Sequence, residues 1–366
     1  HLLYARLKKT ENQFVNFKLN LARSLAALLG LTTTVLLGSD SIPPVTPNAS
    51  PEAVSLLQYI YSISGKQTLA GQHCVPLVGS LRLVGVHRQT KHYPAVFGQD
   101  FGFDAPGSWD GINYRQQIVD EAIRRHQEGF IITLMWHAVR PVDEEPVTFR
   151  ESIQGELTEE EWKSLVTSGT ALNERWKSQV DVIAWHLKQL RNANVPVLWR
   201  PYHEMNGEWF WWGKKSWDNG YKKLYRMLFE RLTHFHGLNN LLWVFNTNEV
   251  KANVEAHETY FPGNDVVDIF ATDVYTQGFD SLNYAQLLKL AGNKPIALGE
   301  VGNAPTLELL KQQPRWTWFM NWGDPEGTWR EQDALRDVYA GEEVLTLEEL
   351  PWAKFVQPQI HFPVLK

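Results

Sequence analysis

Two glutamates, Glu204 and Glu300, end apolar runs of the sequence, and Arg200 stands four residues before the first of them. A pair of carboxyl groups can cleave a glycosidic bond: one protonates the leaving oxygen while the other attacks the anomeric carbon. Carboxyl groups ~5–5.5 Å apart do this with retention of configuration. In an extended strand Arg200 shares a face with Glu204, and a barrel-facing arginine can keep the attacking carboxylate ionised. The residues thus predict acid and nucleophile roles for this pair.

Strand-like runs that alternate with helix-like runs from residue 52 onward are the elements that must position these side chains. Most of the runs are continuously apolar, which is typical of parallel strands covered on both faces. The runs span residues 68–73, 95–101, 130–137, 197–204, 241–248, 267–275, 295–300 and 316–322. Between them, residues 174–193 and 217–236 carry an apolar stripe at helical spacing.

Eight such units in roughly 280 residues indicate an α/β fold of the closed (β/α)8 barrel type. An open doubly wound sheet is the alternative, and it would normally carry a glycine-rich phosphate turn after its first strand. Residues 71–80 read GQHCVPLVGS, which is not such a turn. We therefore expect a single catalytic barrel over residues 52–342, followed by a tail, 343–366, to which we assign no role.

Polar and aromatic residues at the carboxyl ends of barrel strands are the natural candidates for catalysis and binding. Strict alternation would put His203 and Glu204 on opposite faces of their strand, so both reach the site only if the strand is bulged or ends there. Besides Arg200 and the two glutamates, the selected strand-end residues are His73, Asp100, His137, His203, Tyr275 and Trp322.

The composition narrows the class of substrate. The net charge is −6, from 35 basic and 41 acidic residues, so nothing marks nucleic acid or an anionic membrane as a partner. The chain has 16 tryptophans, and tryptophan faces stack on sugar rings, although part of this set must fill the core. Cys74 is the only cysteine, which excludes a zinc site built on thiolates.

The motifs of two other hydrolase classes are missing from the sequence. His203-Glu204 lacks the second histidine of an HExxH helix, and no GxSxG is present. We expect no metal and no cofactor.

The amino-terminal residues are typical of a targeting segment. Lys18 and Arg23 precede an apolar stretch over residues 25–37, which is shorter than a membrane-spanning helix. We interpret residues 1–40 as a leader cleaved near residues 39–41, with a buried first helix as the alternative, and residues 41–51 as a proline-rich linker. The protein is then expected to be secreted or periplasmic, without a stable membrane partner.

The segment WRPYHEMNGEWFWWG, residues 199–213, resembles the acid/base motif of glycoside hydrolase family 26. ALGEVG at 297–302 is similar to the nucleophile strand of that family, and FGQDFG at 97–102 and Trp136-His137 match its barrel ends. The resemblance covers about residues 50–340. It implies a (β/α)8 barrel, retaining chemistry and, for most members of the family, endo-β-mannanase activity.

Carried over residue by residue, the resemblance makes Glu204 the acid/base and Glu300 the nucleophile. His203 would bond the nucleophile or a sugar hydroxyl, and Tyr275 would donate to the nucleophile carboxylate. Three further residues would contact sugar: His137 before the cleaved bond, Trp209 around the cleavage point, and Trp322 beneath the reacting ring.

The substrate and the mode of attack stay open at this point. We expect a β-mannan polysaccharide or manno-oligosaccharide as substrate and a monomeric endo-acting enzyme. Enzymes of the same family that cleave mixed-linkage β-glucan or β-xylan are the alternatives, as is a non-catalytic carbohydrate-binding relative. The long connection over residues 139–195 walls the cleft in this interpretation, and it would make the enzyme exo-acting if it blocks one end.

Overall fold

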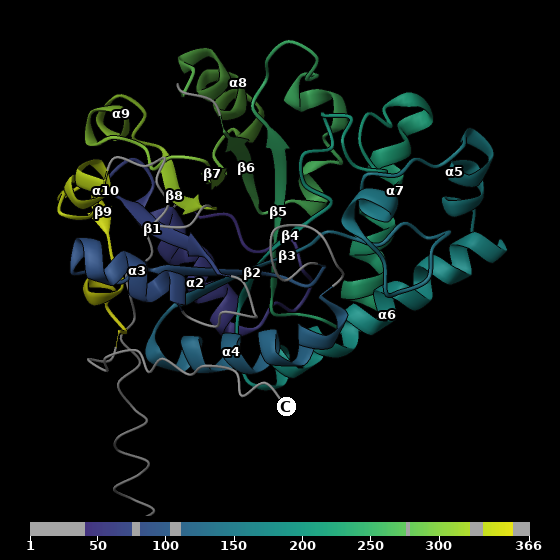
Figure 1. The fold of residues 1–366 in the computed structure, drawn as a ribbon, viewed down its shortest axis with the longest axis horizontal. Coiled ribbons are helices and arrows are strands. Elements are labelled where there is room, and N and C mark those ends of the chain that lie inside the picture. The colour runs from purple at the N-terminus through teal and green to yellow at the C-terminus, as the bar shows by residue number, and fades with distance from the viewer. Residues whose placement is uncertain (1–40, 75–80, 103–110, 276–278, 323–331, 354–366) are drawn as a thin grey trace, which may run out of the picture. The chain divides into compact units, whose positions relative to one another are not determined.

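A closed barrel of eight parallel strands forms the centre of the protein. The computed structural model describes residues 41–74, 81–102, 111–275, 279–322 and 332–353. Each strand from β2 to β7 pairs with the next, and β1 pairs with both β8 and β2, which closes the barrel (Figure 1). The (β/α)8 barrel predicted from the sequence is confirmed.

The observed strands agree closely with the apolar runs. Two of them, β1 and β5, have the predicted bounds, whereas β4 stops three residues before the end of its run. The strands are β1 Thr68–His73, β2 Val96–Asp100, β3 Ile131–Trp136, β4 Val197–Pro201, β5 Leu241–Asn248, β6 Ile269–Val274, β7 Ile296–Val301 and β8 Trp316–Asn321. Every residue of these strands is buried, as expected where helices cover the outer face.

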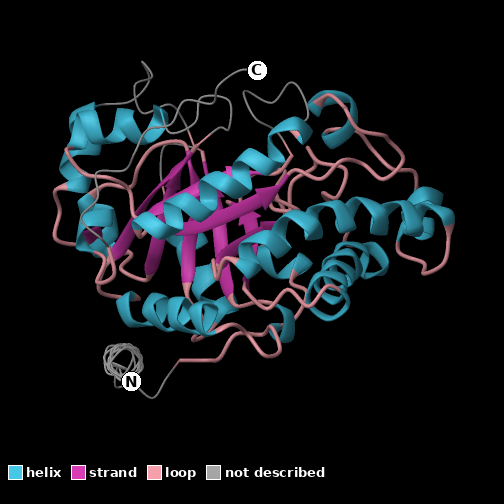
Figure 2. Ribbon diagram, turned by 90° about the horizontal axis from the view of Figure 1, so that it is seen from below, coloured by secondary structure: helices cyan, strands magenta, loops and turns pink. Residues whose placement is uncertain are grey.

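Helices surround the strands, as the side view in Figure 2 shows. The long helix α6 is fixed at its start by the Thr170 hydroxyl, which accepts from the N–H of Asn173, and it buries Trp176, Val180 and Leu187. The α-helices described are α2 Pro51–Ile63, α3 Leu81–Thr90, α4 Arg115–Glu128, α5 Glu159–Leu165, α6 Ala171–Asn192, α7 Gly220–Phe229, α8 Ser281–Ala291, α9 Leu307–Gln312 and α10 Gln332–Tyr339.

The second predicted helix, over residues 217–236, is not continuous. It begins as a 3-10 turn, Trp217–Asn219, continues as α7, and ends as a π-helical turn, Glu230–Phe235. Asp218, inside the 3-10 turn, has a positive φ of 48°, so the chain is kinked just before α7 begins. In the described part of the chain, no helix is both long and apolar enough to cross a bilayer.

The segment interpreted as a proline-rich linker is packed on the barrel. The N–H of Val45 donates to Asp268 over 2.7 Å, the Thr46 hydroxyl donates to the carbonyl of Leu241, and Ser50 caps α2. The described residues from 42 onward form one compact unit, so this stretch is part of the barrel unit rather than a free connection. The leader predicted over residues 1–40 lies outside the described residues.

Part of the predicted tail also joins the barrel. Strand β9, Val344–Leu345, pairs in parallel with the start of β1, and the indole N–H of Trp352 donates to the carbonyl of Gly129. Residues 354–366 lie outside the described residues.

Most of the described tryptophans fill the core rather than form sugar platforms. Nine are buried: Trp136, Trp162, Trp176, Trp199, Trp211, Trp212, Trp243, Trp316 and Trp318.

Candidate active site

A left-handed turn at the end of β4 brings His203 and Glu204 together at the barrel mouth. The strand ends at Pro201, and Tyr202 and Glu204 then adopt positive φ values of 48° and 56°. Non-glycine residues rarely adopt this conformation, and they cluster at functional sites. The turn removes the strand alternation that would have separated the two side chains. It also means that the shared strand face expected for Arg200 and Glu204 is not what places them in the site.

Two neutral donors hold the Glu204 carboxyl group. The indole N–H of Trp209 donates to Oε2 over 2.6 Å, and Nδ2 of Asn248, at the end of β5, donates to Oε1 over 2.6 Å. Gly207 makes the first contact possible, because a Cβ at that position would lie 2.1 Å from the Trp209 ring. Glycine at position 207 therefore leaves the space that the Trp209 ring needs as it crosses the backbone.

An arginine and a tyrosine hold the Glu300 carboxylate. Nη2 of Arg200 donates to Oε1 over 2.9 Å, and the Tyr275 hydroxyl donates to Oε2 over 2.5 Å. The Tyr275 side chain is 42% exposed, so its ring faces solvent while its hydroxyl reaches inward. Nε2 of His203 lies 3.6 Å from Oε1, which is too far for a hydrogen bond.

A β-bulge turns Glu300 into the barrel. Thr272 of β6 is paired with Leu298 of β7, but the next residue, Asp273, is paired with Glu300, so Gly299 is the extra residue. A Cβ on Gly299 would lie 1.8 Å from Oδ1 of Asn246, so only glycine fits the crowded interior.

Asp273 is a third buried carboxyl group in the site. Its Oδ1 lies 3.4 Å from Nη2 of Arg200, while its Oδ2 is buried without a hydrogen-bond partner among the described residues. Burial, followed by the charge of Glu300, raises the pKa of Asp273 well above its usual value. Asp273, Asn246 and Asn248 were not selected from the sequence, although their place at strand ends was the signal that could have identified them.

Glu204 has the electrostatic environment of a proton donor. Burial and then the negative charge of Glu300 raise the pKa of Glu204 to about 7, against the opposing hydrogen bonds from Asn248 and Trp209. Burial, with help from the charges of His137 and Arg200, lowers the pKa of His203 well below its usual value. At neutral pH the site thus combines a partly protonated Glu204 with a neutral imidazole.

His137 and Asp100 form a buried pair beside the two glutamates. Nδ1 of His137 lies 2.6 Å from Oδ2 of Asp100, whose Oδ1 accepts from the backbone N–H groups of Gly102 and His137. Burial alone would lower the pKa of His137, but the Asp100 carboxylate together with the charges of Glu300 and Glu204 outweighs it, and the pKa is raised. Burial would raise the pKa of Asp100, but the His137 ring together with the two backbone N–H donors outweighs it, and the pKa is lowered. The pair is therefore an ion pair in mildly acidic solution.

His73 packs against Trp322. Their rings are stacked with centroids 3.7 Å apart, and the Trp322 ring lies 6.4 Å from that of His137. His137 in turn meets the ring of His203 edge-on at 4.6 Å. Eight of the ten residues selected from the sequence are thus linked through Glu300 and this row of rings. The other two, Glu204 and Trp209, bond to each other and adjoin the rest at His203, whose ring lies within 4.8 Å of a Glu204 oxygen.

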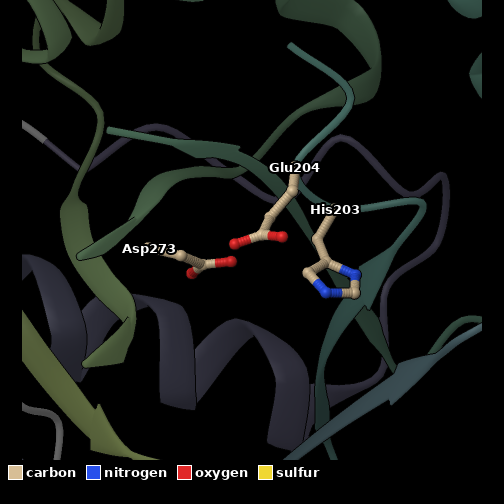
Figure 3. Close-up of side chains that lie close together, drawn as sticks. All are labelled: His203, Glu204 and Asp273. Carbon is tan, nitrogen blue, oxygen red and sulfur yellow. The ribbon is translucent and has the colours of Figure 1, made fainter. Parts of the chain in front are cut away.

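His203, Glu204 and Asp273 offer ligand atoms within 4.8 Å of one another. Figure 3 shows the three side chains close together. A metal ion there would compete with the guanidinium of Arg200, which already lies beside Asp273. It would also compete with the donors on both Glu204 oxygens. These contacts suit proton transfer better than metal binding.

Comparison with known proteins places the chain among glycosidases. The model of glycosyl hydrolase family 26 matches residues 45–349. A mannan endo-1,4-beta-mannosidase of Thermothelomyces thermophilus is 36% identical over 317 residues, which is 83% of this chain and 62% of that protein. The chain spans between 50 and 62% of the length of the first three curated relatives it matches.

Two solved structures share the fold and much of the sequence. The GH26A protein of a Muricauda species has a TM-score of 0.79 and 43% identity, with 83% of this chain and 99% of that chain covered. The GH26-CBM35 beta-(1,4)-mannanase of Podospora anserina has a TM-score of 0.72 and 33% identity, with 86% and 70% covered. Both similarities extend over most of the barrel.

Proposed function

Because the chain belongs to glycosyl hydrolase family 26, we propose that it is a retaining endo-β-1,4-mannanase with Glu204 as acid/base and Glu300 as nucleophile. The observation that carries this proposal is the unequal environment of the two buried glutamates. Glu300 is held by a permanent cation and a phenol, whereas Glu204 has only neutral donors and a pKa of about 7. Carboxyl groups held so differently are suited to opposite roles.

In the first step, Glu300 attacks the anomeric carbon while Glu204 gives its proton to the glycosidic oxygen. The bond between the anomeric carbon and that oxygen breaks, and a glycosyl ester forms on Glu300. Arg200 and Tyr275 fix the orientation of the attacking carboxylate through one hydrogen bond to each oxygen.

In the second step, Glu204 acts as a base. The ester on Glu300 no longer carries a negative charge, so one of the causes that raise the pKa of Glu204 is gone. Glu204 can then take a proton from the water that attacks the anomeric carbon. Two inversions restore the original configuration, so the first product released is the β-anomer.

Mannan is the substrate that the relatives support. The curated relative in Thermothelomyces thermophilus is a mannan endo-1,4-beta-mannosidase, and the Podospora anserina structure is a beta-(1,4)-mannanase. Mixed-linkage glucan and xylan have no comparable support among these matches. A non-catalytic relative is also disfavoured, because both glutamates are present and held by donors.

The place of action follows from the substrate. A polysaccharide is met outside the cytoplasm, and residues 1–40 carry the pattern of a leader. We propose a secreted or periplasmic monomer, which fractionation of the native host and light scattering of the purified protein would test.

The activity is tested with mannan, galactomannan, lichenan and xylan, scored by reducing sugar and by product size. We expect the mannans to be cleaved fastest, with oligosaccharides as early products. NMR of the early product should show the β-anomer. An α-anomer would exclude retention, and binding of mannan without hydrolysis would favour the non-catalytic alternative.

A further inference from the structure

Asn206, two residues after Glu204, makes an unusually complete set of contacts. Its side chain is fully buried. Oδ1 accepts from the backbone N–H of Asn248 over 2.7 Å, and Nδ2 donates to the carbonyls of Asn248 over 2.8 Å and Glu255 over 3.0 Å. One amide side chain therefore binds both backbone groups of Asn248, the last residue of β5.

Asn248 is the residue that donates to Oε1 of Glu204. Its own side-chain Oδ1 is buried and has no hydrogen-bond partner among the described residues. Among the described residues, the side chain of Asn248 is thus held by its hydrogen bond to Glu204. The place of this donor is then set mainly by the backbone of Asn248, which Asn206 holds.

We propose that Asn206 is a positioning residue for the acid/base, and this inference rests on the proposed function. Asn206 acts through Asn248 to fix the direction of the Glu204 carboxyl group. The terminal torsion of a glutamate is broad, so a carboxyl group held at one oxygen alone can rotate. With Trp209 on Oε2 and Asn248 on Oε1, that rotation is stopped. A misplacement of about 1 Å can cost on the order of a hundredfold in rate.

The chain around Asn206 has supports that a side-chain truncation leaves intact. The backbone carbonyl of Asn206 accepts from the N–H of Glu255, that of Glu204 accepts from Gly207, and that of Met205 accepts from Lys214. Asn206→Ala should therefore keep the turn and loosen the end of β5. A positioning role and a general structural role then predict different kinetics.

The test compares kcat/KM on two substrates that differ in their need for an acid. Mannan has an alkoxide leaving group that must be protonated, whereas the leaving group of 2,4-dinitrophenyl β-mannobioside departs without a proton. For Asn206→Ala we expect a loss of about 10- to 100-fold on mannan and of less than about threefold on the aryl substrate. Equal losses on both substrates would overturn the inference.

Asn240→Ala is the matched control. Asn240 is buried and donates from Nδ2 to the carbonyl of Val195 over 2.8 Å, but it precedes β5 at the opposite end of the barrel. We expect no change in the ratio of the two kcat/KM values. A similar shift of that ratio in Asn240→Ala would overturn the specific role of Asn206.

A double-mutant cycle tests whether Asn206 acts through Asn248. If it does, adding Asn206→Ala to Asn248→Ala should cost no further activity on mannan, whereas additive losses would contradict the route. If Asn206→Ala does not fold, Asn206→Asp, which keeps the acceptor and loses both donors, is compared in the same way. A wild-type protein without activity on either substrate would instead overturn the proposed function itself.

Discussion

Arg200 on β4 donates from Nη2 to Oε1 of Glu300 on β7 over 2.9 Å, across the interior of the barrel. Its Nε also donates to Oδ1 of Asn246 on β5 over 2.8 Å, so the guanidinium is fixed at two points. An arginine stays charged at every pH at which the protein is folded. Glu300 therefore has a permanent counter-charge within the water-poor mouth, as an attacking carboxylate requires.

Replacing the proposed nucleophile should end the activity. We expect Glu300→Ala to lower kcat on mannan by about a thousandfold or more, because no other group can form the glycosyl ester. Glu128→Gln is the control: Glu128 is also buried and paired with an arginine, Arg125, but at the end of α4. Reducing-sugar release by Glu300→Ala at more than a few per cent of the wild-type rate would exclude the assignment.

The hydroxyl of Tyr275 should matter far more than that of Tyr225. Tyr275→Phe removes a donor to Glu300, and we expect kcat/KM to fall by about a hundredfold. Tyr225→Phe removes a buried hydroxyl that has no hydrogen-bond partner among the described residues, so activity should stay and the melting temperature should hold or rise. Equal activity of the two variants would show that the 2.5 Å contact of Tyr275 has no role in catalysis.

The rate should fall as the pH rises through the pKa of Glu204. The acid must be protonated in the free enzyme, and its pKa is about 7, so kcat/KM on mannan should decline above neutrality. Trp209→Phe removes a donor that lowers this pKa, so the decline should move to higher pH. If kcat/KM of Trp209→Phe declines at the same pH as that of the wild type, a group other than Glu204 controls the loss of activity at high pH.

The barrel itself was predictable because its strands are continuous apolar runs, which a fold buried on both faces requires. β1 and β5 have the predicted bounds, and all ten selected residues lie at the mouth. The ends of β4 and β7 were not predictable in the same way. Positive φ at Glu204 and the bulge at Gly299 depend on tertiary contacts rather than on local residue preference.

The contacts within the site could not be predicted from the sequence either. Gly207 and Asn206 stand in a motif that the sequence analysis quoted, yet their roles follow only from what they touch. Asn248 is far from Glu204 in the sequence and reaches it because β5 lies beside β4. Residues 41–51 were interpreted as a linker because proline-rich composition alone does not reveal the barrel contacts of Val45 and Thr46.

The buried pair of His137 and Asp100 should stabilise the fold most in mildly acidic solution. The pKa of Asp100 is lowered from 3.8, so its contribution is present above that value and is lost as the pH falls through the folded-state pKa. The pKa of His137 is raised from 6.5, so its contribution is present below that value and is lost as the pH rises through the folded-state pKa. Both residues are therefore charged at pH values between the folded-state pKa of Asp100 and that of His137.

Asp100→Asn should reveal this window. Within this pH range we expect the variant to lose about 3 kcal/mol of unfolding free energy, measured by urea denaturation. The loss should be smaller at both higher and lower pH. Asp181→Asn is the comparison for an exposed carboxylate: Asp181 lies 2.6 Å from His236 and also accepts from Arg231, but it is 39% exposed. Solvent screens such a pair, so its loss should cost less than about 1 kcal/mol. A difference between Asp100→Asn and wild type that keeps widening as the pH rises would contradict an ion pair at this position.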